Sequence, residues 1–243
     1  MKHNLSYTAL GSRDVEDALS ALGLSVSSEQ IGLLVRHANL VLEANTRLNL
    51  TRIVEPHAVA TLHIADSLAF TTHATLGGRI LDIGAGAGFP GIPLAIIGHD
   101  VWLCESVTKK ASFLSTCLAD LGLHGKVFDI RAEELASTHP AAVDVVVARA
   151  VSSLPSLVEL AAPLLVPGGR LVALKGSPED SERAAGVAAA GICGLVLSSE
   201  IHYSLPAGES RAVFVYERVG RSRVKLPRSP GMAQRHPLAR IEA

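Results

Sequence analysis

The stretch from Arg79 to Pro93, which reads RILDIGAGAGFPGIP, constrains the fold of this chain more than any other. Its first five residues are largely apolar, which predicts a short buried strand. Three alternating glycines follow at once: Gly84, Gly86 and Gly88. They allow a tight turn and the close approach of a ligand to the backbone, and the two prolines beyond them suit a helix start. We expect a strand, a glycine turn and a helix, which together hold a nucleotide-like ligand at the carboxyl edge of a sheet.

These glycines match two ligand-binding patterns. Gly86-x-Gly88-x-x-Gly91 fits the dinucleotide fingerprint, whereas Gly84-x-Gly86-x-Gly88 fits the looser loop of S-adenosylmethionine (SAM) methyltransferases. In the dinucleotide unit the first glycine directly follows the strand, and here that residue is Gly84. Counted from Gly84, the third fingerprint glycine falls at Phe89, a residue too large for close helix–strand packing. We therefore favour SAM as the ligand, and keep a nucleotide-binding or NAD-dependent protein as the alternative.

Composition excludes several protein classes. The chain has 243 residues, 48% of them hydrophobic and 19% charged, enough for one large α/β domain with an extension. No apolar run approaches the roughly 20 residues of a membrane span, so we expect no membrane partner. The three cysteines are too scattered for a disulfide framework, and the ten histidines show no spacing typical of metal ligands. We expect a cytoplasmic monomer without a metal.

The order of predicted elements divides the chain into three parts. Residues 1–75 are predicted to be helical and to form a cap. Residues 76–220 alternate strands with helices, which predicts a parallel sheet; the expected strands are 79–83, 100–104, 126–130, 143–148 and 170–174. Two further strand-like runs, 195–203 and 211–219, are joined by only seven residues, too few for a helical crossover, and must pair antiparallel. The fold class is therefore α/β, a Rossmann-like methyltransferase sheet with a C-terminal antiparallel hairpin.

The end of the chain is basic. Residues 211–243 hold eight Lys or Arg against two Glu on a chain whose net charge is −1. A basic end on a nearly neutral protein points weakly to nucleic acid, and equally to a solvated tail. We expect residues 221–243 to form a flexible basic tail.

Polar residues follow the predicted strands at the edge where the ligand would lie. Glu105 ends the second strand, where a carboxylate accepts hydrogen bonds from ribose hydroxyls. Ala132 and Glu133 follow the third strand, where a backbone N–H and a carboxylate can contact an adenine edge. Arg149 follows the fourth strand, and its guanidinium suits a carboxylate or phosphate. Each residue also has a simpler interpretation. Glu105 can be a surface glutamate, Glu133 a solvated loop acid, and Arg149 a partner in an ion pair with Asp82 or Asp144.

Residues of the cap contribute further candidates. His63 and Asp66 lie three apart on the predicted helix 56–72, and Asn49, Thr51 and Arg52 lie on the loop before it. Polar groups on an otherwise apolar helix can form the roof of a substrate cleft. The alternative is that His63 makes an ordinary helix–helix contact.

No residue pattern indicates a general base or a nucleophile. After the fourth strand the chain reads Arg-Ala-Val-Ser rather than the Asn/Asp-Pro-Pro-aromatic run common in methylation of exocyclic amines. We expect Cys104, Cys117 and Cys193 to be small core residues, so methylation of a pyrimidine carbon lacks its nucleophile. The acceptor is then an atom with a free lone pair, such as purine N7. Positioning of two reactants suffices for that chemistry, and no catalytic side chain is assigned.

In several sequence motifs the chain resembles bacterial 16S rRNA guanine-N7 methyltransferases of the glucose-inhibited division protein B family. The resemblance is carried in order by Asn49–Thr51, His63–Ser67, Leu81–Pro93, Glu105–Lys110, Phe113–Leu114, Arg131–Glu133, Ala148–Ala150 and Ala173–Gly176. The Gly-Phe-Pro-Gly-Ile-Pro run is the most specific of these.

The resemblance implies a methyltransferase sheet with an N-terminal helical cap, and SAM as the methyl donor. It implies donor contacts at Gly84, Phe89, Ala132, Glu133 and Arg149, to which the glycine pattern adds Gly86 and Gly88 and the strand order adds Glu105, often Asp in the family. It implies a guanosine in the decoding-region loop of 16S rRNA as acceptor, the small ribosomal subunit as partner, and a link of gene loss to low-level streptomycin resistance. A SAM-dependent methyltransferase of a small molecule or protein remains the alternative.

Overall fold

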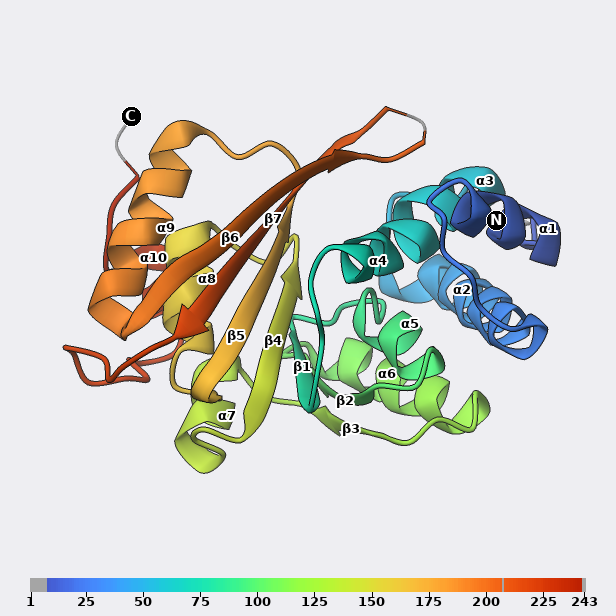
Figure 1. The fold of residues 1–243 in the computed structure, drawn as a ribbon. Coiled ribbons are helices and arrows are strands. Elements are labelled where there is room, and N and C mark those ends of the chain that lie inside the picture. Colours follow the sequence, from blue (N-terminus) through green and yellow to red (C-terminus); the bar gives the residue numbers. More distant parts are fainter. Residues whose placement is uncertain (1–7, 207, 242–243) are drawn as a thin grey trace.

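The computed structural model describes residues 8–206 and 208–241, and its centre is a seven-stranded sheet (Figure 1). The strands are β1 (Arg79–Ile83), β2 (Asp100–Cys104), β3 (Gly125–Phe128), β4 (Val143–Arg149), β5 (Leu165–Lys175), β6 (Leu195–Ser204) and β7 (Ser210–Arg218). Their order across the sheet is β3-β2-β1-β4-β5-β7-β6, with the first five parallel and β7 antiparallel to both of its neighbours. The predicted fold class, including the antiparallel hairpin, is confirmed.

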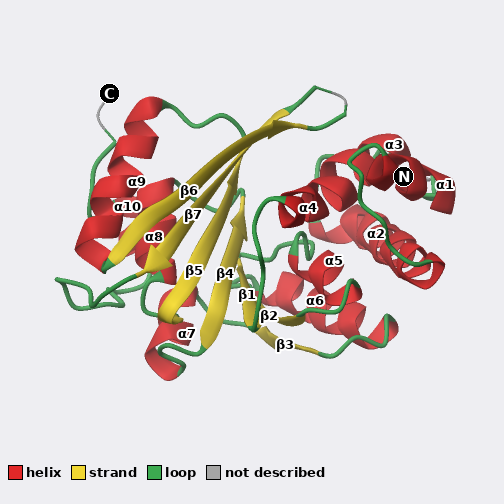
Figure 2. Cartoon of the chain, in the orientation of Figure 1, coloured by secondary structure: helices red, strands yellow, loops and turns green. Residues whose placement is uncertain are grey.

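Helices cover both faces of this sheet (Figure 2). Those of the sheet domain are α5 (Gly91–Ile96), α6 (Thr108–Asp120), α7 (Ala132–Thr138), α8 (Leu154–Ala161), α9 (Asp180–Cys193) and α10 (Met232–Arg235). Two hydrophobic clusters lie on opposite faces, because successive side chains of a strand point to opposite sides. Ile80 of β1 belongs to the cluster with α5, α6 and the cap, and Leu81 to the cluster with α7, α8 and α9.

The N-terminal cap consists of α1 (Ser12–Ser20), α2 (Ser28–Leu48) and a broken helix over residues 56–72. Ser27 begins α2 with the predicted capping box: its Oγ accepts from Gln30 N at 3.2 Å, and Gln30 Oε1 accepts from Ser27 N at 2.9 Å. The segment expected as one helix comprises α3 (Pro56–Val59), a π-helical turn (Ala60–Ala65), α4 (Asp66–Ala69) and a 3₁₀ turn (Phe70–Thr72).

The cap and the sheet share one hydrophobic core. Leu34 and Leu42 of α2 are buried in the same cluster as Leu94 of α5 and Leu114 of α6. The cap therefore packs on the face of the sheet that α5 and α6 cover. The first seven residues of the expected cap lie outside the described residues.

The end of the chain differs from the expected flexible tail. Residues beyond β7 run back across α8, and Ala233 of α10 is 1% exposed in the second hydrophobic cluster. Arg228 forms a two-pronged ion pair with Glu159, with Nε–Oε1 and Nη2–Oε2 both at 2.6 Å. The basic composition misled the prediction because this arginine is held by a carboxylate that is distant in sequence. Residues 242–243 lie outside the described residues. None of the helices in the described ranges combines the length and apolar character that a membrane span needs.

Candidate active site

The glycine turn between β1 and α5 is shaped by its glycines. Gly84 N and Ala85 N both donate to Cys104 O, at 2.8 and 3.1 Å, which ties the turn to the end of β2. Gly84, Gly86 and Gly88 have φ of +67°, +56° and +93°, a region that favours glycine. A Cβ on Gly84 would lie 2.8 Å from a Val151 methyl. A Cβ on Gly86 would meet only Gly84 O at 3.7 Å, so the backbone is open to a ligand at Gly86.

Close packing of the helix on the sheet is provided by a fourth glycine. A Cβ on Gly91 would lie 2.3 Å from Leu103 Cδ2 and 2.7 Å from Asp82 Oδ2. Phe89 was expected to prevent close helix–strand packing, but Gly91 allows that close approach two residues later. Register alone therefore does not separate SAM from a dinucleotide.

Glu105, at the end of β2, holds the glycine turn. Its Oε2 accepts a hydrogen bond from Gly86 N at 3.0 Å, and its Oε1 accepts one from Val107 N at 2.8 Å. The side chain is buried, so the alternative of a surface glutamate is wrong. Both oxygens of this carboxylate therefore accept hydrogen bonds from the backbone of the loops at the end of β1 and β2.

Phe89 is enclosed by two histidines of the cap. The ring of His63 stacks on it at 4.7 Å between centroids, and His37 of α2 lies against it at 4.5 Å, tilted by 44°. His37 Nε2 lies 3.0 Å from Ala87 O; a carbonyl only accepts, so Nε2 carries the proton. The cap therefore contacts the turn twice, through the Phe89 side chain and through the backbone carbonyl of Ala87.

Burial keeps both histidines neutral. Desolvation lowers the pKa of His37 to about 4. Desolvation, with Arg149 nearby, lowers the pKa of His63 to about 3. The Nδ1 of His63 faces Arg149 Nη2 at 3.4 Å, and an arginine only donates, so Nε2 of His63 donates to Thr51 Oγ1 at 2.7 Å. His63 lines the larger cavity described below, and its ring contacts Phe89 in the glycine turn rather than a neighbouring helix.

Arg149 is the centre of a buried charge cluster. Its Nη1 donates to Leu62 O at 3.1 Å and to Asp66 Oδ2 at 3.3 Å. Asp66 Oδ1 also accepts from Arg211 Nε of β7 at 2.8 Å. The alternative expected from sequence, an ion pair with Asp82 or Asp144, is wrong, because the side chain turns toward the cap.

Asp82 lies beneath the turn at the end of β1. Its Oδ2 accepts from Gly91 N at 2.9 Å, and the side chain is 1% exposed. Burial raises the pKa of Asp82 to about 7, and the hydrogen bond from Gly91 and the charge of Arg149 oppose that rise. Asp82 therefore holds the start of α5 in either protonation state.

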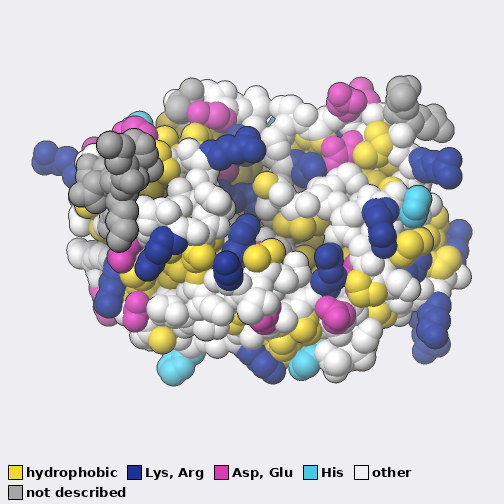
Figure 3. All heavy atoms as spheres, turned by 180° about the vertical axis from the view of Figure 1, so that it is seen from behind, with side chains coloured by type: hydrophobic (Ala, Val, Ile, Leu, Met, Phe, Trp, Pro, Cys, Tyr) yellow, Lys and Arg dark blue, Asp and Glu magenta, His cyan; other side chains and the backbone are white. Residues whose placement is uncertain are grey.

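Two cavities flank this site. The smaller, of about 70 Å³, lies at the ends of β1, β2 and β3, and its lining includes Gly84, Ala132, Glu133 and Gln234. The larger, of about 410 Å³, lies beside Arg149, with His63, Lys175, Tyr203 and Arg211 in its wall. Seen from behind, Lys and Arg side chains gather around a hollow in the middle of the molecule (Figure 3).

None of the three cysteines is suited to act as a nucleophile. All three are buried, as predicted, and burial raises the pKa of each thiol to about 12. A thiol with that pKa is protonated at neutral pH and is no nucleophile. Cys104 donates instead to Ile130 O at 3.2 Å.

The predicted site residues fall into three groups in space. Glu105 lies against the glycine turn, Phe89 under the cap, and Ala132 with Glu133 in the smaller cavity. Arg149 faces the larger cavity, with its guanidinium 5.6 Å from the Phe89 centroid. Sequence reasoning missed His37, Lys175, Arg211 and Gln234. For His37 the available signal was a polar residue on the apolar face of α2. Lys175 lies in the run Ala173–Gly176 that carries the resemblance, and Arg211 begins the basic end of the chain, but neither pattern indicated a place beside a cavity.

Comparisons with known proteins agree with this geometry. A family model described as rRNA small subunit methyltransferase G matches residues 30–205. The ribosomal RNA small subunit methyltransferase G of Streptococcus pyogenes serotype M12 (strain MGAS2096) is 36% identical over 235 residues, which cover 93% of this chain and 99% of that protein. The protein of the same name from Geotalea uraniireducens is 36% identical over 202 residues, covering 82% and 92%.

The fold has relatives at much lower sequence identity. A putative RNA methyltransferase of Pyrococcus horikoshii has a TM-score of 0.52 at 15% identity, and covers 80% of this chain and 98% of that chain. That likeness concerns the fold alone. The match of the family model over most of the chain confirms the resemblance seen in the motifs, and this chain belongs to the rRNA small subunit methyltransferase G family.

Proposed function

We propose that this protein transfers the methyl group of SAM to N7 of a guanosine in the decoding-region loop of 16S rRNA. The observation that carries the proposal is family membership across residues 30–205, joined to a glycine turn whose backbone is open at Gly86. The donor supplies an activated methyl group. The residues of this chain bind and orient the two reactants.

The donor would lie along the carboxyl ends of β1, β2 and β3. Gly84, Gly86 and Gly88 shape the turn beneath its methionine end, with Phe89 supporting the turn from below. Glu105 accepts from the ribose hydroxyls, and Ala132 with Glu133 faces the adenine. The fit rests on the open space at Gly86 and on the cavity beside Ala132 and Glu133.

The acceptor base would enter the larger cavity. Its volume of about 410 Å³ suits a nucleobase, and Arg149 lies at its border with the glycine turn. Lys175 in its wall is paired with Glu182 at 2.7 Å, whereas Arg149 and Arg211 share the single carboxylate of Asp66. Two guanidinium groups on one carboxylate leave a positive charge, which attracts a phosphodiester backbone. Guanine N7 carries a lone pair and no proton, so no general base is needed and the neutral state of His63 is no obstacle.

The test is to map N7-methylguanosine in 16S rRNA from cells that lack the gene. We expect one such site to disappear and to return when the recombinant protein and SAM are added to small subunits from those cells. An unchanged pattern would contradict the proposal. Transfer to a metabolite extract or to proteins but not to rRNA would favour the alternative methyltransferase, and tight NAD binding without SAM binding would favour a dinucleotide-binding protein.

The cellular setting follows from this substrate. A ribosome-modifying enzyme works in the cytoplasm, and a single copy suffices because the described residues of one chain line both cavities. As the family resemblance implies, we expect loss of the gene to give low-level streptomycin resistance. Light scattering of the purified protein tests the monomeric state.

A further inference from the structure

We infer that the C-terminal segment, residues 226–239, forms one wall of the adenine end of the donor pocket, with Gln234 facing the ligand. The inference rests on the proposed use of SAM and goes beyond it, because the family model matches only residues 30–205. The sequence suggested a tail for RNA docking; the structure places this segment at the donor site.

The first observation is a contact between this segment and Glu133. Gly231 N donates a hydrogen bond to Glu133 Oε1 at 2.6 Å, and the Glu133 side chain is buried. Gly231 has φ of +80°, a conformation that suits glycine and aims its N–H at the carboxylate. One oxygen of Glu133 is thus held by the segment, and the second can accept from the adenine amino group.

The second observation is the lining of the smaller cavity. Its walls come from the ends of β1, β2 and β3, from Val151 and Leu160, and from Gln234 of α10. Gln234 is the residue of the C-terminal segment in that lining. A glutamine amide carries both a donor and an acceptor, the pair that matches adenine N7 and N6. An adenine ring placed between Ala132 and Val151 would therefore have its N6 and N7 edge next to the side-chain amide of Gln234.

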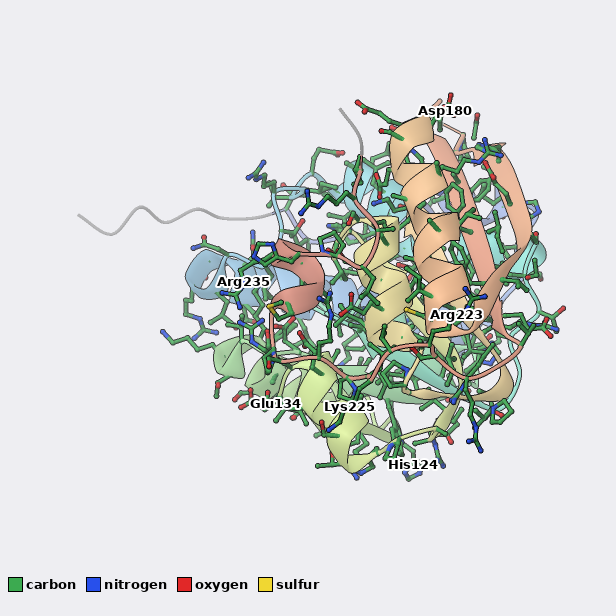
Figure 4. All side chains as sticks on the ribbon, turned by 90° about the vertical axis from the view of Figure 1, so that its left-hand side faces the viewer. His124, Glu134, Asp180, Arg223, Lys225 and Arg235 are labelled. Carbon is green, nitrogen blue, oxygen red and sulfur yellow. The ribbon has the colours of Figure 1, made fainter. Side chains whose placement is uncertain are left out.

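The third observation is that the segment is firmly attached to α8. Ser156 Oγ donates to Ala233 O at 2.8 Å, and Ser156 is 1% exposed. Arg228, paired with Glu159, also donates from Nη2 to His236 O at 2.7 Å, so one guanidinium joins both ends of the turn to the helix. Figure 4 shows the segment passing Lys225, crossing toward α7 and α8 and turning into α10, where Arg235 is labelled. These hydrogen bonds to α8 hold the C-terminal segment in place, so that it can form a fixed wall of the smaller cavity.

The experiment is calorimetric titration of SAM, S-adenosylhomocysteine and adenosine into the full chain and two variants. Gln234→Ala should raise the Kd for all three ligands by about fivefold to thirtyfold, the effect of losing one or two hydrogen bonds. Lys225→Ala is the matched control, since this exposed residue precedes the segment and makes no contact with the cavity; its Kd values should equal those of the wild type. Equal or tighter binding by Gln234→Ala overturns the inference.

A second pair of variants tests the segment as a whole. A chain ending at residue 225 should bind SAM weakly or not at all; tighter binding would mean that the segment obstructs the pocket, and would overturn the inference. Because that chain loses buried contacts and can fail to fold, Ser156→Ala is measured beside it. It keeps the segment and removes one anchor, and it should weaken SAM binding by about threefold to tenfold with an unchanged circular dichroism spectrum.

Failure of this inference is distinguishable from failure of the proposed function. If the wild type binds no SAM, the proposed function and the inferred wall of the SAM pocket are both refuted. If the wild type binds SAM and methylates small subunits, and Gln234→Ala does both equally well, the proposed function stands and the wall alone is refuted.

Discussion

The imidazole of His63 lies parallel to the ring of Phe89, 4.7 Å between centroids with 12° between planes. His63 belongs to the cap and Phe89 to the glycine turn, so this stack transmits the position of the cap to the part of the sheet domain that would hold SAM. Both residues are joined to Arg149, whose guanidinium lies 5.6 Å from the Phe89 centroid. The cap therefore contacts the glycine turn directly.

Removing this stack should loosen the turn. We expect His63→Ala to lower the free energy of unfolding by about 1 to 2 kcal/mol, from the lost aromatic pair and its hydrogen bond, and to weaken SAM binding. Urea denaturation and calorimetry measure the two effects. His57→Ala, an exposed histidine one and a half turns earlier, should change neither. Equal effects of the two variants would show that the stack is dispensable.

Gly86 and Gly122 offer a matched pair for testing the ligand site. Their φ values are +56° and +64°, so an added methyl group strains both positions by a similar amount, about 1 kcal/mol. Neither methyl would clash with the protein. Gly86→Ala should raise the Kd for SAM on the order of tenfold, because the methyl fills the space over the turn. Gly122→Ala should lose a similar stability and keep its affinity; a parallel loss of affinity would assign the effect to strain.

Asp66 holds two arginines and should be costly to neutralise. Asp66→Asn leaves Arg149 buried with one carboxylate fewer, and we expect the free energy of unfolding to fall by about 3 kcal/mol. The comparison is Asp100→Asn, which breaks the exposed pair between Arg79 Nε and Asp100 Oδ2 at 2.9 Å and should cost less than about 1 kcal/mol. Chemical denaturation of both variants decides, and a loss below 1 kcal/mol for Asp66→Asn would contradict the cluster's role.

Asp82 should make the free energy of unfolding fall as the pH rises. Its pKa rises from 3.8 to about 7 on folding, so between these values the folded protein holds a proton that the unfolded chain has released. Its contribution to stability is full below pH 3.8 and is lost as the pH rises through about 7. Asp82→Asn removes this loss, so the difference in unfolding free energy, variant minus wild type, should grow by up to about 1.4 kcal/mol per pH unit across this window.

The measurement is urea denaturation of both proteins at pH 4.5, 5.5 and 6.5. His37 and His63 have lowered pKa values and act in the opposite direction, since their contribution is lost as the pH falls below 6.5. Both histidines are present in the two proteins, so their effects largely cancel in the difference. A constant difference over the three pH values would show that Asp82 is ionised throughout.

The sheet and the turn were predictable because their signals are local. The glycines stand next to the strand they terminate, and the short link between residues 203 and 211 forces β6 and β7 to pair antiparallel. α7 escaped prediction although its sequence contains a start signal, Glu134 Oε2 accepting from Arg131 N at 2.9 Å. An arginine at the N-cap lies outside the usual Ser, Thr, Asp or Asn preference, so the sequence does not mark the start of this helix clearly.

The sequence by itself determined the fold class, the place of the glycine turn and the family, since each depends on spacing along a few neighbouring residues. Only the tertiary structure decided the partners of the buried charges. Asp66 meets Arg149 across 83 positions, and Glu159 meets Arg228 across 69. No local pattern encodes such pairs, because a buried charge takes whichever opposite charge the packing of distant elements brings within reach. For that reason the basic end of the chain, expected as a free tail, lies against α8, where Arg228 pairs with Glu159.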